Sequence, residues 1–422
     1  MIRKYWLRAS VASAVLALAF AQGAGAQVSC TVTVTGQNNP VVDAAAVQSV
    51  VNQAFVGDLT VCLEGTFDFG APVPPSVNSV TIVASPFTTG VHIVGLNDAQ
   101  GKKATIRNGT QSLTKQTTAP LTFSIENLRF EQPAFTAISI LGAGPASAIK
   151  ITGVDIVGVR TFLFPAFNNR FREGIVVGTA LAPVGGEIEI SNNVIDGGTY
   201  TADDTTIGVS GGIVLTGALP NNVPAAQPFT ARVRIADNRI TNWSGSGILA
   251  AGVSELTIER NVIQPGAFAN TTPPGCTAPN GTGAANGMSL QSVRDATVRD
   301  NVITLVPALT GASATPSCTA GLILTGPTNV APGSADGNIV YRNRIRGSGT
   351  YGIVVGVTAS LPPGPTVSVE TDNLFALNRL GNFAAQGASL FIGPGANGNA
   401  FVGNFPSLAG NVAGNDVISR QP

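Results

Sequence analysis

The clearest pattern in the chain is a short unit of alternating apolar and polar residues that occurs twice in succession near its middle. In the first copy Val233 and Ile235 alternate with polar residues and lead to Asn238. The second copy repeats this order up to Asn261, and a second apolar run, GILA, begins at Gly247 between the two asparagines. Alternation with a period of two is typical of β-strands, and Asn and Gly at fixed offsets indicate turns with left-handed backbone angles.

The same unit recurs along most of the chain as two interleaved series. One series is an asparagine preceded three residues earlier by an apolar residue, and the other is a glycine that opens an apolar run. The asparagines are Asn193, Asn238, Asn261, Asn301, Asn343, Asn378 and Asn404, and the glycines are Gly174, Gly212, Gly247, Gly287, Gly321, Gly352 and Gly387. One glycine run lies between each pair of asparagines, so the chain is an array of similar coils.

These coils predict the fold. A unit of about 23 residues with short strands and no helical period cannot bury its apolar side chains alone, whereas coils stacked about 4.8 Å apart would bury them in one column. We therefore predict an all-β, single-domain, right-handed parallel β-helix, since parallel crossovers are almost always right-handed. In these features the chain resembles the pectate-lyase-like superfamily of β-helix proteins, over roughly residues 28–418.

The N-terminus predicts export. Residues 1–26 combine a basic start with the apolar run Val11–Ala21 and the ending Ala24-Gly25-Ala26, which is the pattern of a signal peptide. The run is too short to span a membrane as a helix, so no transmembrane segment is expected after cleavage. The mature chain, residues 27–422, is then secreted or periplasmic, and residues 27–76 form its N-terminal cap and first coils.

A short helix is predicted to close the N-terminal end of the array. The segment DAAAVQSVVNQAF begins at Asp43, which we expect to cap it. Its shared apolar face consists of Val47, Val50, Val51, Ala54 and Phe55. Stacked arrays need a cover over their open end, and this helix is the obvious cap.

Four cysteines remain after the predicted cleavage, and export permits disulfides. Cys30 and Cys62 lie in two predicted neighbouring strands, so we expect them to pair. Cys276 and Cys318 lie in long insertions of two consecutive coils, at the same corner, and we predict a second disulfide between them.

Charge is sparse and balanced. Charged residues make up 11% of the chain and the net charge is +0, which argues against a nucleic-acid partner. The residues that precede four successive asparagines alternate in sign: Asp237, Arg260, Asp300 and Arg342. With Glu259 beside Arg299, they predict a ladder of ion pairs with a structural role, or alternatively a charged strip that contacts glycans. The asparagines themselves are expected to stack as an amide ladder.

The residues predicted to point outward from the glycine runs are almost wholly aliphatic. They are Val176, Val214, Leu249, Ser289, Ile323 and Val354. A cleft that cleaves sugars would need carboxylates, arginines or aromatic residues at these positions. We expect long loops to cover this row, with a docking surface as the alternative.

The superfamily resemblance implies catalytic residues that are mostly missing here. Its glycosidase branch uses an Asn-Thr-Asp set, an Asp-Asp pair, a Gly-His-Gly and an Arg-Ile-Lys, of which only the pair Asp203-Asp204 is present. For the lyase branch, which relies on calcium-binding acids and a basic residue, the two aspartates could bind Ca²⁺ and Arg170 or Lys150 could act as base. The sole histidine, His92, is predicted to be a wall residue.

One segment concentrates aromatic and charged residues in a chain that is only 6% aromatic. This segment, residues 160–173, is predicted to be a loop, and its members are Phe162, Phe164, Phe167, Phe171, Arg170, Arg172 and Glu173. Aromatic faces and planar guanidinium groups suit stacking on sugars and binding of carboxylates, so Phe167, Phe171, Arg172 and Glu173 are candidate binding residues. The alternative is that the phenylalanines pack over the outer wall.

These observations predict a secreted, monomeric, non-catalytic extracellular or envelope protein that engages glycan or surface partners through its loops. The alternative is a polysaccharide lyase or glycosidase with a divergent site built from Arg170, Asp203 and Asp204. A third hypothesis is a purely structural protein without a ligand. No phosphate-binding loop or zinc-ligand spacing is present, so no cofactor other than Ca²⁺ is expected.

Overall fold

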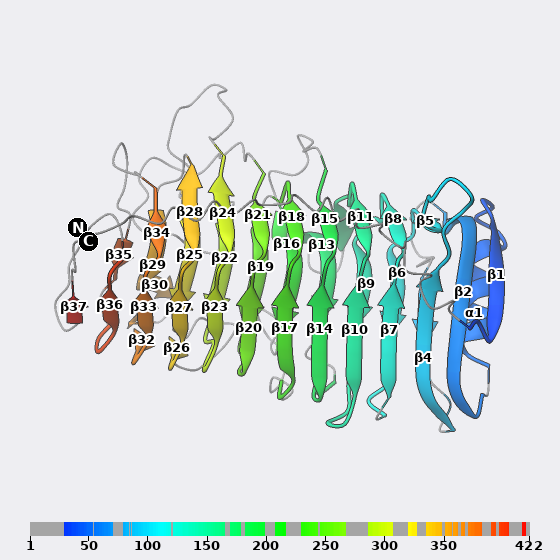
Figure 1. The fold of residues 1–422 in the computed structure, drawn as a ribbon, viewed down its shortest axis with the longest axis horizontal. Helices are drawn as coiled ribbons and strands as arrows, with labels where there is room; N and C mark the ends of the chain where they lie inside the picture. Colours follow the sequence, from blue (N-terminus) through cyan, green and yellow to red (C-terminus); the bar gives the residue numbers. More distant parts are fainter. Residues whose placement is uncertain are drawn as a thin grey trace, which may run out of the picture.

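The protein is described here from a computed structural model. It describes residues 29–53, 55–70, 79–83, 85, 87–119, 121–164, 169–178, 182–198, 207–216, 229–243, 245–266, 286–306, 320–326, 335–347, 351–356, 358–361, 364–367, 370–381, 390–393, 396–404 and 416–418. Within these residues the chain is a right-handed parallel β-helix with one short N-terminal helix, which confirms the predicted fold class (Figure 1).

The strands stack in three columns, which we call sheets 1, 2 and 3. Sheet 1 consists of β1 (Val32–Gln37), β2 (Gly57–Asp68), β4 (Thr88–Gly95), β7 (Thr122–Glu126), β10 (Ala148–Thr152), β14 (Glu187–Ser191), β17 (Arg232–Ala236), β20 (Leu256–Glu259), β23 (Thr297–Arg299), β27 (Ile339–Tyr341), β33 (Leu374–Ala376), β36 (Ala400–Val402) and β37 (Asp416–Ile418). Sheet 2 consists of β5 (Thr105–Arg107), β8 (Arg129–Glu131), β11 (Asp155–Val157), β15 (Val194–Asp196), β18 (Arg239–Thr241), β21 (Val262–Gln264), β24 (Val302–Leu305), β28 (Arg344–Gly347) and β34 (Arg379–Leu380). The two sheets are continuous because the long strand β2 pairs with both β4 and β5.

Sheet 3 consists of the strands that open with the glycine runs and their earlier counterparts. They are β3 (Val80–Ile82), β6 (Gln111–Lys115), β9 (Thr136–Ile140), β13 (Asn169–Val177), β16 (Ile207–Thr216), β19 (Ser246–Ala251), β22 (Asn286–Gln291), β25 (Ala320–Thr325), β29 (Tyr351–Val355) and β35 (Leu390–Ile392), with β12 (Phe162–Phe164) antiparallel to β13. Two small pairs lie outside the columns: β26 (Ala335–Asp336) with β32 (Glu370–Thr371), and β30 (Thr358–Leu361) with β31 (Gly364–Val367).

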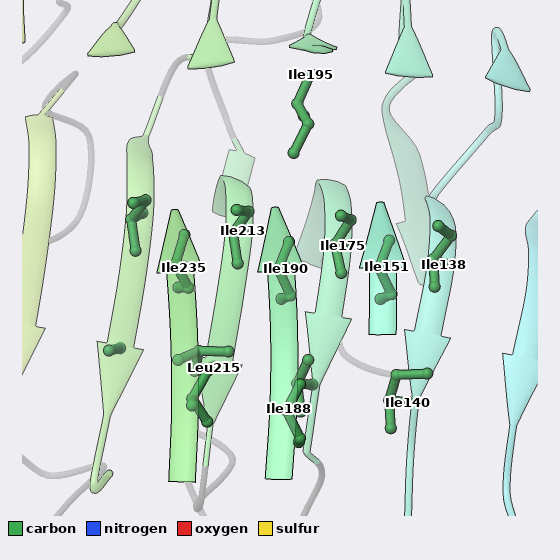
Figure 2. Close-up of a cluster of buried hydrophobic side chains, with 14 of the residues drawn as sticks. Ile138, Ile140, Ile151, Ile175, Ile188, Ile190, Ile195, Ile213, Leu215 and Ile235 are labelled. Carbon is green, nitrogen blue, oxygen red and sulfur yellow. The ribbon is translucent and has the colours of Figure 1, made fainter. Parts of the chain in front are cut away.

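The core is a continuous column of aliphatic side chains between the sheets. Figure 2 shows isoleucines of sheets 1 and 3 between the two sheets: Ile151, Ile190 and Ile235 from sheet 1, and Ile138, Ile175 and Ile213 from sheet 3. All six are fully buried. Each strand has alternate residues inside, so the same register that fills the core fixes which residues face outward.

The asparagine series forms the predicted amide ladder. Each side chain donates from Nδ2 to Oδ1 of the next asparagine at 2.9 to 3.0 Å, from Asn193 through to Asn404. The left-handed residue of each turn is the one before the asparagine, for example Asp237 with φ 59° and Arg260 with φ 54°. The turns therefore contain the left-handed conformation that the sequence indicated, and the asparagine that follows it supplies the hydrogen bonds of the ladder.

A second, shorter ladder runs through Asn338, Asn373 and Asn399, with side-chain bonds of 2.8 Å. It lies at the corner that leads into sheet 1, whereas the first ladder lies between sheets 1 and 2. Sequence analysis did not predict it.

The N-terminal end is closed as expected by α1 (Asp43–Val51), with Val47, Val50 and Val51 buried. Asp43 is the first helical residue and not the cap: its carboxylate accepts hydrogen bonds from the backbone of Gln37, Asn39 and Asp68 at 2.8 to 2.9 Å. The amide of Gln48 makes two 2.7 Å hydrogen bonds to the backbone of Thr81, on the first strand of sheet 3. The helix thereby covers the core and pairs with an exposed sheet edge.

The predicted disulfide between Cys30 and Cys62 is present, with the Cα atoms 5.6 Å apart. It links the residues before β1 to the neighbouring strand β2. Cys276 and Cys318 lie outside the described residues, so their pairing stays a prediction. No helix within the described ranges has the length and apolar character needed to cross a membrane.

Candidate functional site

A concave surface with many polar and charged side chains lies on the outer face of sheet 1, in its N-terminal half. The central outward residues of six neighbouring strands form one row: His92 on β4, Ser124 on β7, Lys150 on β10, Glu189 on β14, Arg234 on β17 and Thr257 on β20. A second row, two residues earlier on each strand, contains Thr122, Ala148, Glu187 and Arg232. These residues line an open groove of about 770 Å³.

Opposite charges face one another along the groove. Glu187 and Arg232 form an ion pair at 2.5 Å, and Glu189 and Arg234 form another at 2.8 Å. Both pairs join directly neighbouring strands, so the stacking of coils places each guanidinium beside a carboxylate. The two ion pairs therefore present donors and acceptors at fixed positions in the groove.

Lys150 differs from its neighbours because its ammonium is exposed and has no ion pair within the described residues. It lies between Ser124 on one side and Glu189 on the other. A Lys ammonium carries three donors, so this position can bind acceptor oxygens of a ligand.

His92 and Ser124 are in direct contact at the floor of the groove. Nδ1 of the imidazole lies 2.9 Å from the hydroxyl oxygen of Ser124, which is only 4% exposed. The carboxylate of Asp58 lies near the other ring nitrogen: a β-carbon on Gly90 would lie 2.6 Å from Asp58 Oδ1 and 2.9 Å from His92 Nε2. Thr89 donates to the same carboxylate oxygen at 2.6 Å.

The predicted ion-pair ladder lies beside the asparagine turns. Arg260 binds Asp237 through two hydrogen bonds of 2.8 Å, and Arg342 binds Asp300 at 2.9 Å, as the alternation predicted. Glu259 pairs with Arg299, as expected, and also with Arg234 and Arg260.

Burial on its own raises the pKa of the Glu259 carboxyl. Hydrogen bonding from Arg234 and the positive charges of the three surrounding arginines outweigh this effect, so the pKa lies below its ordinary value. Glu259 is thus held ionised at the centre of the cluster.

The predicted loop of residues 160–173 is partly a β-hairpin. Strand β12 pairs antiparallel with the start of β13, and Arg170 lies opposite Leu163. The prediction of a loop was wrong there because the chain folds back and adds a strand to sheet 3. Arg170 and Phe171 lie on the backbone of β13, while Phe167, Asp203 and Asp204 lie outside the described residues.

Arg172 and Glu173 are buried within the fold. Arg172 is 1% exposed, donates to the carbonyls of Val159 and Gly197, and lies with its guanidinium 5.8 Å from the ring centre of Trp243. Glu173 is 6% exposed, and burial raises its pKa to about 8 although a hydrogen bond from Thr136 acts in the opposite direction. The binding role of both residues remains a prediction, and they lie on sheet 3, away from the groove on sheet 1.

The outward row of sheet 3 is buried, whereas the long loops expected to cover it lie largely outside the described residues, so their role as the cover stays a prediction. The exposed fractions of Val176, Val214, Ser289, Ile323 and Val354 are 8% or less, and Leu249 is half-buried. This row therefore presents no open cleft along its described strands.

Sequence reasoning missed most of the groove. His92 and Lys150 were singled out separately, whereas Ser124, Glu187 and Arg232 were not considered. The available signal was the polar residue between two apolar ones in FSIE, IKIT, EIEIS and VRIA. Across the described residues, no group of three or more His, Cys, Asp or Glu side chains is arranged to hold a metal ion.

No protein-family model matches the sequence, and no curated protein matches it significantly. Comparison with solved structures gives 43 matching chains. The Dettilon tailspike protein aligns with a TM-score of 0.44 and 14% identity, covering 91% of this chain and 68% of that one. DFA-IIIase from Arthrobacter chlorophenolicus A6 aligns with a TM-score of 0.46 and 10% identity, covering 91% of this chain and 95% of that one. PfbA, a surface adhesin of Streptococcus pneumoniae, aligns with a TM-score of 0.45 and 9% identity, covering 88% of this chain and 91% of that one. These values transfer no activity to this chain.

Proposed function

We propose that this protein is a secreted, monomeric β-helix that binds a glycan chain along the groove on the outer face of sheet 1. The single observation that carries the proposal is the row of hydroxyl, imidazole, ammonium, carboxylate and guanidinium groups along six consecutive coils. Sugars offer many hydroxyl donors and acceptors, and fixed polar side chains on a rigid sheet can match them without ordering a loop.

The state of the carboxylates favours binding of the glycan over cleavage of its backbone. A glycosidase needs one carboxyl group that carries a proton and a second that acts as base or nucleophile. In the groove Glu187 and Glu189 are each engaged by an arginine, at 2.5 and 2.8 Å. Because a guanidinium already engages each carboxylate, neither residue is placed to contact the oxygen of a leaving sugar.

Export is supported by one prediction and one observation. The first is the predicted signal peptide of residues 1–26, and the second is the disulfide between Cys30 and Cys62. Disulfides persist in oxidising compartments such as the periplasm and the cell exterior. Both places give access to polysaccharides and cell-surface glycans.

The second candidate function is a polysaccharide lyase or glycosidase that uses Arg170, Asp203 and Asp204, with Ca²⁺ bound by the aspartates. It is favoured by one pairing: Arg170 on β13 lies beside Ile207 on β16, which follows Asp204 by three residues in the sequence. Cleavage of an acidic glycan that is lost in both Arg170→Ala and Asp204→Ala would establish this alternative.

The test of the proposal is a binding screen of the full-length chain against neutral and acidic polysaccharides by affinity electrophoresis, followed by calorimetry on any oligosaccharide that binds. Lys150→Ala should weaken binding by about 10-fold, equivalent to about 1.4 kcal/mol. Lys102→Ala is the matched control because Lys102 is exposed and lies outside the groove. Binding that is unchanged by Lys150→Ala, or no binding to any glycan, would refute the proposal.

A further inference from the structure

We propose that His92 and Ser124 form a base and nucleophile pair that hydrolyses ester groups. The inference rests on the proposed glycan-binding function in one respect: the ester would be an O-acyl substituent carried by the bound glycan. The geometric basis is the contact of 2.9 Å between His92 Nδ1 and the Ser124 hydroxyl, on the floor of the groove. A hydroxyl becomes a useful nucleophile when an adjacent imidazole takes its proton.

The neighbourhood of the imidazole favours the required tautomer. Asp58 Oδ1 and His92 Nε2 both lie beside the place that a β-carbon on Gly90 would occupy, at 2.6 and 2.9 Å from it, and no hydrogen bond joins them directly. A carboxylate on that side stabilises the proton on Nε2, which leaves Nδ1 as the acceptor for the Ser124 hydroxyl. In this proposal Asp58 is a positioning residue that acts on His92 through its negative charge and not through a direct hydrogen bond, across the space that Gly90 leaves open.

Lys150 supplies positive charge on the other side of the nucleophile. It is the direct neighbour of Ser124 on the adjacent strand, and both residues face the groove. During attack on an ester, the carbonyl oxygen gains negative charge, which a nearby ammonium stabilises. The three groups therefore flank the place where an acyl group would lie.

The reaction follows from these positions. Ser124 Oγ attacks the ester carbonyl carbon while its proton moves to His92 Nδ1. The bond from this carbon to the alcohol oxygen then breaks, and the alcohol leaves with the proton from His92. Water attacks the acyl-serine, gives a proton to His92 and releases the carboxylic acid, and Ser124 regains its proton. The balance is one ester and one water converted to one acid and one alcohol, without any further reactant.

We assign esters as the chemical class because the pair places a hydroxyl nucleophile beside a base, which is the arrangement that acyl transfer needs. An ester needs only a nucleophile, a base and stabilisation of the oxyanion. An O-acyl group projects from the sugar ring, so it can reach Ser124 while the chain itself lies across the ion-paired residues.

The experiment uses two probes on the purified full-length chain: a fluorophosphonate that labels activated serines, and p-nitrophenyl acetate as a simple ester. We expect the label on Ser124 by peptide mass analysis, and ester hydrolysis reduced at least about 100-fold in Ser124→Ala. The control is Ser49→Ala, because Ser49 is an exposed serine on α1 outside the groove. It should retain full labelling and hydrolysis.

His92→Gln distinguishes a catalytic role of the imidazole from a structural one, because glutamine can still hydrogen-bond to Ser124 but cannot take its proton. It should fold normally by circular dichroism and lose the fluorophosphonate label. Asp58→Asn should slow labelling, and Asp58→Glu, which restores a carboxylate, should recover part of the rate. Labelling that is absent in the folded protein, or that is equal in Ser124→Ala, would overturn the inference. Such a result would leave glycan binding, measured by the Lys150→Ala comparison, unaffected.

Discussion

Gly212 of sheet 3 lies directly against Ile240 of sheet 2: a β-carbon on the glycine would be 2.5 Å from Cγ2 of the isoleucine. The same contact recurs wherever the two series run together, between Gly174 and Ile195, Gly247 and Ile263, Gly287 and Ile303, and Gly321 and Ile345. The glycine series and the isoleucines that follow the asparagines are therefore two halves of one packing contact. The glycines are needed for this close approach.

Replacing Gly212 with alanine should destabilise the fold. The added methyl group would overlap the isoleucine and also come 2.7 Å from the carbonyl oxygen of Gly247. Overpacking of this kind typically lowers the free energy of unfolding by about 1–3 kcal/mol. Urea unfolding followed by circular dichroism would measure it.

A second variant isolates the contact with Ile240. Ile240→Ala alone should destabilise by leaving a cavity, but the double variant Gly212→Ala, Ile240→Ala should lose less stability than the sum of the two single changes. If the loss of unfolding free energy in the double variant equals the sum of the two single losses, the glycine is not required for its contact with Ile240.

The asparagine ladder should contribute strongly to stability. Asn261→Ala removes the oxygen that accepts hydrogen bonds from the backbone and the side chain of Asn238, at 3.0 and 2.9 Å. Both donors are buried, and unsatisfied buried donors cost about 1–3 kcal/mol. Asn39→Ala is the control because Asn39 lies outside the ladder, is exposed and accepts one local hydrogen bond from the backbone of Val41. Equal losses of unfolding free energy for the two variants would contradict this account.

The coils after residue 174 were predictable because their strands, turns and glycines repeat with fixed order. Before that point Leu128 and Val154 replace asparagine at the turn position, so the sequence does not fix the register between the strands of neighbouring coils. The contact between His92 and Ser124 spans 32 residues and depends on this register. Sequence alone therefore named His92 as a wall residue and could not pair it with Ser124.

Burial of charge is the other feature that the sequence did not predict. Arg172 and Glu173 stand in a polar and aromatic segment that is typical of an exposed loop. In the structure, β13 lies between β9 and β16 and its start is paired with β12, so these residues are enclosed. The second ladder was also missed, although Asn338, Asn373 and Asn399 each follow a left-handed residue, as in the first ladder.

The carboxylate of Glu259 should stabilise the fold at neutral pH. Its side chain is 4% exposed and contacts three arginines, so Glu259→Gln would leave them without their shared partner. We expect a loss of about 1–3 kcal/mol at pH 7. Because the folded pKa is lowered, this stabilisation is present above the ordinary pKa of 4.5 and is lost as the pH falls further. The difference between wild type and variant in urea unfolding should therefore shrink below pH 4.5. Glu187→Gln is the control, since its carboxylate is mostly exposed and pairs with one arginine.

Glu173 should make the protein less stable as the pH rises. Burial raises its pKa from 4.5 to about 8, so the folded state holds a proton that the unfolded chain releases between these values. The contribution of Glu173 is thus complete below pH 4.5 and is lost as the pH rises to about 8, with a slope of up to about 1.4 kcal/mol per pH unit.

Glu173→Gln tests this directly, because glutamine has nearly the shape of the protonated acid and does not titrate. Other groups titrate alike in both proteins, so the difference in unfolding free energy reports on Glu173. The variant should match wild type near pH 4.5 and become progressively more stable than it towards pH 8, as measured by urea unfolding at intervals of one pH unit. A difference that is constant with pH would mean that this carboxyl group titrates normally, and a difference of opposite slope would mean that a cationic group within the fold holds it ionised.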